Sequence, residues 1–79
     1  MFPLFIIALD KVLFEGKTNS VTLPGSEGEL TILKNHIPLI TPLKKGNIKL
    51  KTKKEELNFR INGGVLEVKP EKVVVLTIP

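Results

Sequence analysis

The segment NIKLKTKKEELNFRIN, from Asn47 to Asn62, alternates apolar and polar side chains with a period of two. In its first half Ile48 and Leu50 alternate with lysines, and in its second half Leu57 and Phe59 alternate with asparagine and arginine. A period of two is typical of a β-strand with one face packed and the other in water. The short polar stretch between the halves suits a hairpin. The segment therefore predicts two antiparallel strands, with the lysine row on a solvated face that discourages edge-to-edge aggregation.

The rest of the chain shows the same kind of pattern. Short β-branched runs occupy residues 65–68 and 73–78, joined by a turn at Pro70. Residues 12–15 and 20–23 also have the composition of strands, and Gly16 is expected to end the first of them. Six glycines and six prolines are spread so evenly that no helix of ordinary length fits between them. These features predict an all-β sandwich or barrel of eight to ten short, mostly antiparallel strands.

Two runs are apolar at both odd and even positions. FPLFIIAL, Phe2 to Leu9, is too short to span a bilayer and lacks the features of a signal peptide, so we expect a buried first strand in a soluble protein. The run from Val73 to Ile78 is expected to be covered on both faces. Between two strand-like runs, Gly63 and Gly64 suggest a β-bulge or a close approach of two backbones.

Length and composition limit the kind of protein this is. The 79 residues make one domain, residues 1–79, and the absence of cysteine excludes disulfides and thiolate metal sites. The formal charge of +4 and the pI near 9.6 keep nucleic acids and anionic membranes among the possible partners. The lysines are scattered, however, and the only aromatic residues are four phenylalanines, which disfavours a surface on which bases stack.

Few residues could carry catalysis. His36 is the only histidine, and neither Ser20 nor Ser26 lies in the sequence context of a nucleophile elbow. His36, Glu27 and Glu29 match no known spacing of metal ligands, and the glycines beside the glutamates do not form a phosphate-binding loop. The sequence therefore predicts no catalytic residues, no metal site and no cofactor, with a small hydrolase centred on His36 kept as an alternative.

The polar positions of GSEGELTILKNHIPLI, Gly25 to Ile40, each allow two interpretations. Glu27 and Glu29 lie on one side if the chain is extended there, and they are either solvated turn carboxylates or charges for docking. His36 is either a corner histidine bonded to a carbonyl group or part of a docking surface. Docking needs only exposure and complementary charge, whereas catalysis needs far more.

Three segments in order along the chain resemble a known family. They are VLFEG at residues 12–16, LPGSEGELTILKNHIPLITPLKKGNIKL at residues 23–50 and INGGVLEV at residues 61–68. Together they resemble the amino-terminal domain of the epsilon subunit of bacterial F-type ATP synthases, over nearly the whole chain. The resemblance implies a flattened β-sandwich of about ten strands.

The resemblance also implies a function. It implies a non-catalytic subunit of the central stalk, the rotor, which binds the gamma subunit and the c ring and couples ion-driven rotation to ATP synthesis. Such a subunit is peripheral, at the cytoplasmic face of the cell inner membrane, and does not insert into it. The residues expected at the c ring are Gly25, Ser26, Glu27, Gly28 and Glu29. Those expected at the gamma subunit are His36, Pro38, Leu39, Ile40 and Thr41, and the glycines expected to be structural are Gly16, Gly46, Gly63 and Gly64.

The sequence departs from the family pattern in two ways. Thr31 stands in place of a usual glycine and Lys34 in place of a frequent proline, and Thr31 either tightens a strand or alters the approach of another backbone. Typical members continue into a two-helix carboxy-terminal domain that restrains ATP hydrolysis and in some members binds ATP. This sequence stops at Pro79, as a fragment or a naturally short member, so we carry over neither role. A small basic nucleic-acid-binding module is the main alternative to the stalk subunit.

Overall fold

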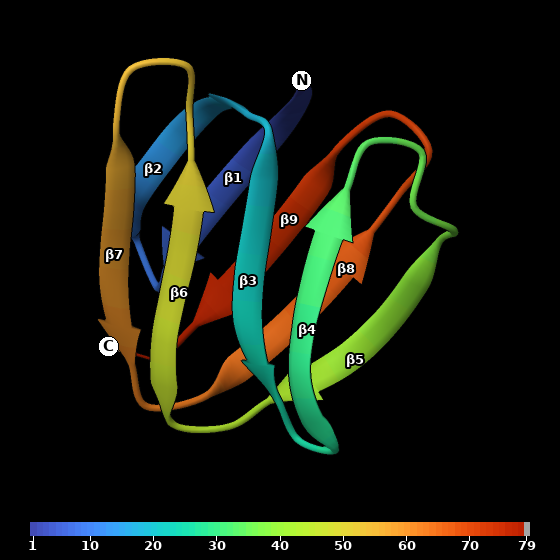
Figure 1. Ribbon diagram of the computed structural model, residues 1–79. Helices are drawn as coiled ribbons and strands as arrows, with labels where there is room; N and C mark the ends of the chain where they lie inside the picture. The colour runs from blue at the N-terminus through green and yellow to red at the C-terminus, as the bar shows by residue number, and fades with distance from the viewer. Residues whose placement is uncertain (79) are drawn as a thin grey trace.

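The computed structural model describes residues 1–78 and consists of β-strands joined by turns and short loops (Figure 1). The strands are β1 (Phe2–Ala8), β2 (Lys11–Thr18), β3 (Ser20–Gly25), β4 (Gly28–Leu33), β5 (Leu39–Leu43), β6 (Gly46–Lys51), β7 (Glu56–Ile61), β8 (Gly64–Val68) and β9 (Val73–Thr77). The all-β prediction is confirmed, with nine strands in the described part of the chain. These residues include no helix long and apolar enough to cross a membrane.

The strands pair along one continuous path, β2-β1-β9-β8-β5-β3-β6-β7. The remaining strand, β4, lies off this path and pairs with β3. The path curls into the two layers of a sandwich, with β4, β3, β6 and β7 in front and β2, β1, β9, β8 and β5 behind (Figure 1). We call the layer behind the first sheet and the layer in front the second sheet. One residue pair, Gly25 with Leu43, joins β3 to β5 and so links the layers. The pairing of β1 with β9 is parallel, and the other pairings are antiparallel.

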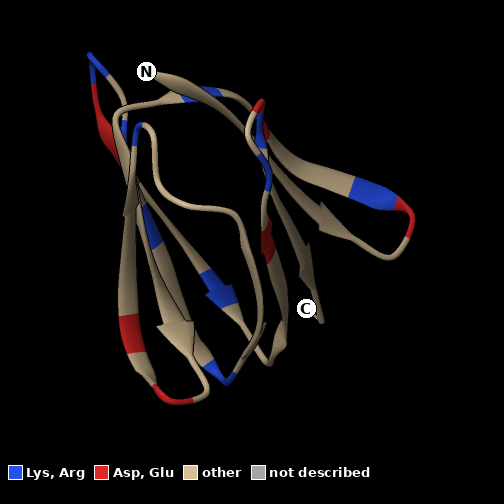
Figure 2. Cartoon of the chain, turned by 90° about the vertical axis from the view of Figure 1, so that its right-hand side faces the viewer, with Lys and Arg blue, Asp and Glu red and all other residues tan. Residues whose placement is uncertain are grey.

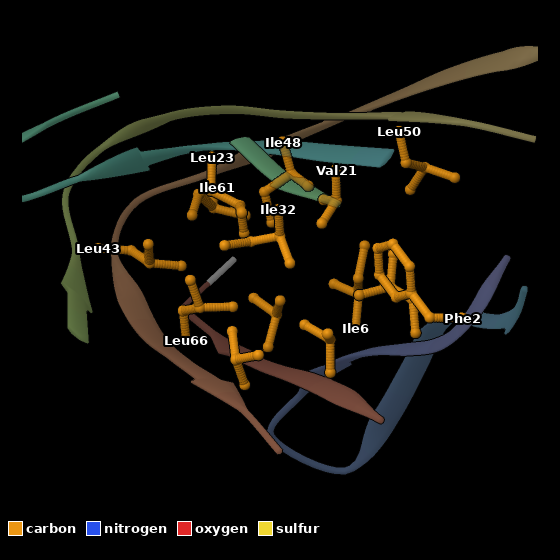
Figure 3. Close-up of a cluster of buried hydrophobic side chains, with 14 residues drawn as sticks. Phe2, Ile6, Val21, Leu23, Ile32, Leu43, Ile48, Leu50, Ile61 and Leu66 are labelled. Carbon is orange, nitrogen blue, oxygen red and sulfur yellow. The ribbon is translucent and has the colours of Figure 1, made fainter. Parts of the chain in front are cut away.

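The core lies between the two sheets and is built from inward-facing residues of every strand except β2, whose half-buried Leu13 and Phe14 pack against it (Figure 3). Ile48 and Leu50 of β6 are fully buried, while Lys49 between them is exposed, which confirms the strand and its faces predicted from the period of two. The first strand behaves in the same way, with Leu4 and Ile6 fully buried. Alternation with a buried face is the signal that fixes the register of each strand.

A buried hydroxyl holds the corner where the chain passes from the first sheet to the second. Thr18, at the end of β2, is fully buried, and its one hydroxyl proton is shared between the carbonyl oxygens of Ser20 and Lys51, which lie 2.8 and 2.6 Å from Oγ1. The backbone N–H of Asn19 donates to the same Lys51 oxygen at 2.7 Å. The corner between β2 and β3 is thereby attached to Lys51, at the end of β6 in the second sheet.

Two predictions about strands are wrong. Gly16 does not end a strand but lies inside β2, paired with Leu4 of β1, because the extended backbone continues through it to Thr18. The run from Val73 to Ile78 is not covered on both faces: Leu76 is 53% exposed and Ile78 59%. The side chains of β9 alternate as in the other strands, and no described element covers the outer face of the first sheet.

The other three glycines expected to be structural differ in what surrounds them. A Cβ at Gly46 would come within 2.9 Å of Pro24 Cβ, on the neighbouring β3. Gly63 and Gly64 have φ angles of 142° and 154°, and a Cβ at Gly64 would overlap the carbonyl oxygen of Leu76 in β9. Gly64 therefore allows the close approach of β8 and β9, one of the two features that the sequence suggested there, whereas a Cβ at Gly63 would come no closer than 3.6 Å to its neighbours.

Candidate functional site

The turn between β3 and β4 is a tight two-residue connection that presents its side chains to solvent. Gly25 pairs with Gly28, so that Ser26 and Glu27 form the turn, and Gly28 has a φ of 135°. The N–H of Ser26 donates to the carbonyl oxygen of Pro42 at 3.0 Å, which anchors the turn to the end of the first sheet. The turn is thus held on a backbone that is part of the fold.

The two glutamates of this turn are both exposed and border one shallow hollow of about 100 Å³. Thr41 of β5 lies at the edge of the same hollow. Glu29 is on the outer side of β4, two residues before Thr31 on the same face. Thr31, the departure from the family pattern, forms a cross-strand hydroxyl pair with Thr22, with 3.1 Å between the two Oγ1 atoms. The threonine therefore adds a link between β3 and β4.

His36 lies in the connection between β4 and β5, where Asn35 has a φ of 68°. The backbone N–H of His36 donates to the carbonyl oxygen of Leu33 at 3.2 Å. The ring Nδ1 lies 2.8 Å from the carbonyl oxygen of Ile37. Because a carbonyl oxygen only accepts, Nδ1 carries the proton in this bond. His36 is thus a corner histidine bonded to a carbonyl group, and its expected contact with the gamma subunit stays a prediction.

The other residues expected at the gamma subunit occupy β5 and the residue before it. Pro38, Leu39 and Ile40 line an open groove of about 430 Å³ together with Val68 and Pro70. Ile40 is 71% exposed, on the outer face of the first sheet. The five residues are therefore not brought together at one point, since His36 borders a separate cavity of about 40 Å³ and Thr41 faces the β3–β4 turn.

The most distinctive surface of the molecule is not among those predicted from the sequence. On the outer face of the first sheet, apolar side chains form a row across four neighbouring strands, from Val12 of β2 through Ile7 of β1 and Leu76 of β9 to Val65 of β8. Val12 is 54% exposed and Val65 41%. We call this row the outer apolar face. The signal that could have found it is the apolar run at both parities in β1 and β9, which was interpreted as burial.

A hollow adjoins the outer apolar face at the ends of β1 and β9. Ile7, Val65, Leu76 and Ile78 line this hollow of about 420 Å³, together with Leu9 of the β1–β2 turn. Leu9 is 88% exposed and has a φ of 50°, which is uncommon for a bulky residue. The positive φ is that of a two-residue hairpin turn, and this turn holds the exposed leucine beside the apolar hollow.

A family assignment follows from comparison with known proteins. The model of the family described as the β-sandwich domain of the ATP synthase delta/epsilon chain matches residues 1–78. The chain belongs to this family. The recognition made from VLFEG, GSEGEL and INGGVLEV is confirmed, and the nucleic-acid-binding alternative finds no support.

Relatives that contain the same domain support this family assignment. The chain is 40% identical to an ATP synthase epsilon chain of Chlorobium limicola over 77 residues, which are 96% of this chain and 88% of the relative. It is 42% identical to an ATP synthase epsilon chain of Dehalococcoides mccartyi over 71 residues, 90% of this chain and 51% of the relative. This family domain therefore spans about half the length of several of the relatives it matches.

Solved structures show the same fold. A chain in the structure of the Euglena gracilis mitochondrial ATP synthase, OSCP/F1/c-ring, matches with a TM-score of 0.92 at 20% identity, covering 99% of this chain and 51% of that chain. A chain in the central stalk/c-ring structure of the Tetrahymena thermophila mitochondrial ATP synthase matches with a TM-score of 0.83 at 17% identity, covering 99% and 63%. At these identities the likeness establishes the sandwich of the family domain.

Among residues 1–78 no three His, Cys, Asp or Glu side chains come together as a metal site. The features that this family domain offers are surfaces for contact: the outer apolar face, the groove beside β5 and the acidic turn from Gly25 to Glu29. The roles of the individual residues at these surfaces remain predictions.

Proposed function

We propose that this domain belongs to the central stalk of an F-type ATP synthase, where it binds the gamma subunit and rests on the c ring. In this role it has no active site and transmits rotation driven by ion flow to ATP synthesis. It stays peripheral, at the cytoplasmic face of the membrane. The family assignment supports the proposal, and so do the fold matches, which come from a central stalk/c-ring structure and an OSCP/F1/c-ring structure.

The single observation that carries the proposal is the outer apolar face. A small soluble domain rarely leaves large apolar side chains exposed side by side on several strands, and such a patch marks an interaction site. Fully burying a valine or leucine side chain stabilises a complex by about 1.5–3 kcal/mol, and side chains that are already half-buried gain roughly half of that. Covering the row from Val12 to Val65, with Leu9 and Ile78, thus contributes several kcal/mol. We assign this face to the gamma subunit.

The groove beside β5 extends the same contact. Ile40 of β5 is on the outer face of the first sheet, paired with Glu67 of β8, which pairs in turn with Val74 of β9. Ile40 therefore lies on the same side of the sheet as Leu76. This continuity joins Pro38, Leu39 and Ile40, expected at gamma from the resemblance, to the surface that the sequence did not reveal.

The acidic turn is the proposed contact with the c ring. It lies at the lower end of the sandwich in Figure 1, between β3 and β4, and Figure 2 shows its red segments at the bottom of the turned view. The c-ring loops implied by the resemblance are polar and carry basic residues, so Glu27 and Glu29 are complementary to them. Such exposed charges favour orientation and association rate, and salt screens them.

Backbone hydrogen bonds attach the turn to the first sheet. The Ser26 N–H donates to the Pro42 oxygen, and the Lys44 N–H donates to the Pro24 oxygen at 2.8 Å, so the end of β3 and the first residue of the turn are attached to the end of β5 and the residue after it. Because β5 belongs to the first sheet, a force on the turn passes through backbone hydrogen bonds to the sheet that carries the outer apolar face.

Calorimetry with the gamma subunit of the same organism, at two salt concentrations, tests this function. We expect tight binding with only modest salt dependence and a negative heat-capacity change, because apolar burial dominates the contact. A well-folded sample that does not bind gamma overturns the proposal.

A further inference from the structure

The charged side chains are unequally divided between the two ends of the sandwich. One end, at the top of Figure 1, is formed by the β2–β3, β4–β5, β6–β7 and β8–β9 connections and the strand residues beside them, and we call it the basic end. It carries seven lysines and three glutamates, whereas the remaining charged side chains are five basic and five acidic. The basic end therefore holds the whole formal charge of +4, at the opposite end from the acidic turn (Figure 2).

The first part of the basic end is the β6–β7 hairpin tip, which is an ordered structure. Thr52 organises it: the N–H groups of Lys54 and Glu55 donate to Thr52 Oγ1 at 3.2 and 3.1 Å, and the Thr52 N–H donates to the Glu55 oxygen at 2.9 Å. Lys51 pairs weakly with Glu56 at 3.8 Å. Lys53 and Lys54 are exposed and make no ion pair with another described residue.

The second part lies across the same end, on the β4–β5 and β8–β9 connections. The β8–β9 turn is closed by the Lys69 N–H, which donates to the Lys72 oxygen at 2.8 Å. The ammonium group of Lys72 lies 5.6 Å from the centroid of the Phe5 ring, which restrains that cation. Lys34 follows β4 directly, and Asn35 borders the same small cavity as Lys69 and Lys72. The two parts therefore hold cations on fixed backbones at one end of the molecule.

We propose that the basic end binds an acidic polypeptide, an exposed segment of another protein rich in aspartate and glutamate. Lysines at fixed positions with unpaired ammonium groups are complementary to such a segment. Glu55, Glu56 and Glu71 stand among the lysines and repel the continuous phosphates of a nucleic acid or an anionic lipid surface, whereas a polypeptide can place a basic residue opposite each. The end also lacks arginine, Phe2 near it is buried, and the half-buried Phe5 ring is already in contact with the Lys72 ammonium group, so that bases find little ring surface to stack on.

The β6–β7 hairpin tip is separate from the residues assigned to gamma and to the c ring, whereas Lys69 also lines the groove beside β5. The inference therefore goes beyond the proposed function at the hairpin tip, and the test is placed there. The test uses the 79-residue chain and a labelled oligoglutamate as the probe, at low salt where the Debye length exceeds about 10 Å. The variant is Lys53→Glu with Lys54→Glu, at the hairpin tip. The matched control is Lys44→Glu with Lys45→Glu, an exposed pair in the β5–β6 connection at the other end, which changes the formal charge by the same amount.

We expect the hairpin variant to weaken binding of oligoglutamate by at least about tenfold, and the control pair by about twofold or less, because only the former reverses charge at the site. Amide shifts on titration should concentrate at residues 51–56, 34 and 69–72.

Equal losses in the two variants overturn the proposal, because they mean that net charge alone attracts the probe. Stronger binding to single-stranded DNA of equal charge, or to phosphatidylglycerol vesicles, also overturns it and assigns the end to nucleic acid or lipid. Gamma binding should survive in the hairpin variant, so a failure of either proposal is visible independently of the other.

Discussion

Ile7 of β1 and Leu76 of β9 are register partners on adjacent parallel strands, and both side chains lie on the outer face of the first sheet. They come from opposite ends of the sequence, so the outer apolar face exists only when the first and last strands pair. A parallel pair requires a long connection, and here it is the rest of the domain. The candidate contact surface is therefore a product of the complete fold, and each variant below is checked first for stability.

Replacement of Gly64 by alanine should destabilise the domain more than replacement of Gly28. Both glycines have φ angles in the region that side chains avoid, 154° and 135°, which costs about 1–3 kcal/mol for alanine. A Cβ at Gly28 meets nothing within 4 Å, whereas at Gly64 it overlaps the Leu76 oxygen and forces β8 away from β9. Denaturant unfolding of both variants measures the difference, and equal losses would contradict the close approach of the two strands.

The two buried threonines should respond in opposite ways to replacement by valine. Thr18→Val removes the hydroxyl that bonds the Ser20 and Lys51 oxygens, and we expect a loss of about 1–2 kcal/mol. Thr77 is also buried, but its hydroxyl has no hydrogen-bond partner among residues 1–78, so Thr77→Val should be neutral or stabilising. Thermal unfolding separates them, since 1 kcal/mol shifts the melting temperature of a domain this size by about 4–8 °C. A larger loss at Thr77 than at Thr18 would refute this account of the corner.

The sequence predicts the strands well where one face is buried and the other is charged. The lysines between Ile48 and Leu50 mark a single core face, and β6 and β7 appear where the period of two places them. The prediction fails for β9, because an apolar run at both parities looks the same whether a neighbouring layer or a partner protein covers it. It also fails at Gly16, where backbone pairing to Leu4 continues through a residue that often ends strands.

The candidate site was less predictable than the fold. The turn from Gly25 to Glu29 is a local motif, and it is visible in the sequence because its residues are consecutive. The outer apolar face is not local, since Val12, Ile7, Leu76 and Val65 meet only through the strand order β2-β1-β9-β8. Nothing in the spacing of these residues indicates that the first strand pairs with the last, so no sequence pattern could place them in one row.

Reversal of charge at Glu29 should separate docking from folding. Glu29→Lys changes an exposed carboxylate in the β3–β4 hairpin, so the melting temperature should stay within about 3 °C of the parent. Attachment to the c ring in the reassembled complex should weaken, because a basic side chain then faces basic loops. Co-purification of ring subunits measures it, with Glu71→Lys at the basic end as a control that retains the ring. A large loss of thermal stability would show that Glu29 is a structural residue instead.

The central claim is that the outer apolar face binds gamma, and one pair of variants tests it most directly. Leu76 of β9 and Leu33 of β4 are both exposed leucines, 53% and 57%, on the outer sides of the two opposite sheets. Calorimetry with gamma should show that Leu76→Glu weakens binding by at least about tenfold, since it places a charge in an apolar contact, while Leu33→Glu binds like the parent. If both variants bind gamma as tightly as the parent, or if only Leu33→Glu loses binding, the gamma subunit does not bind the outer apolar face.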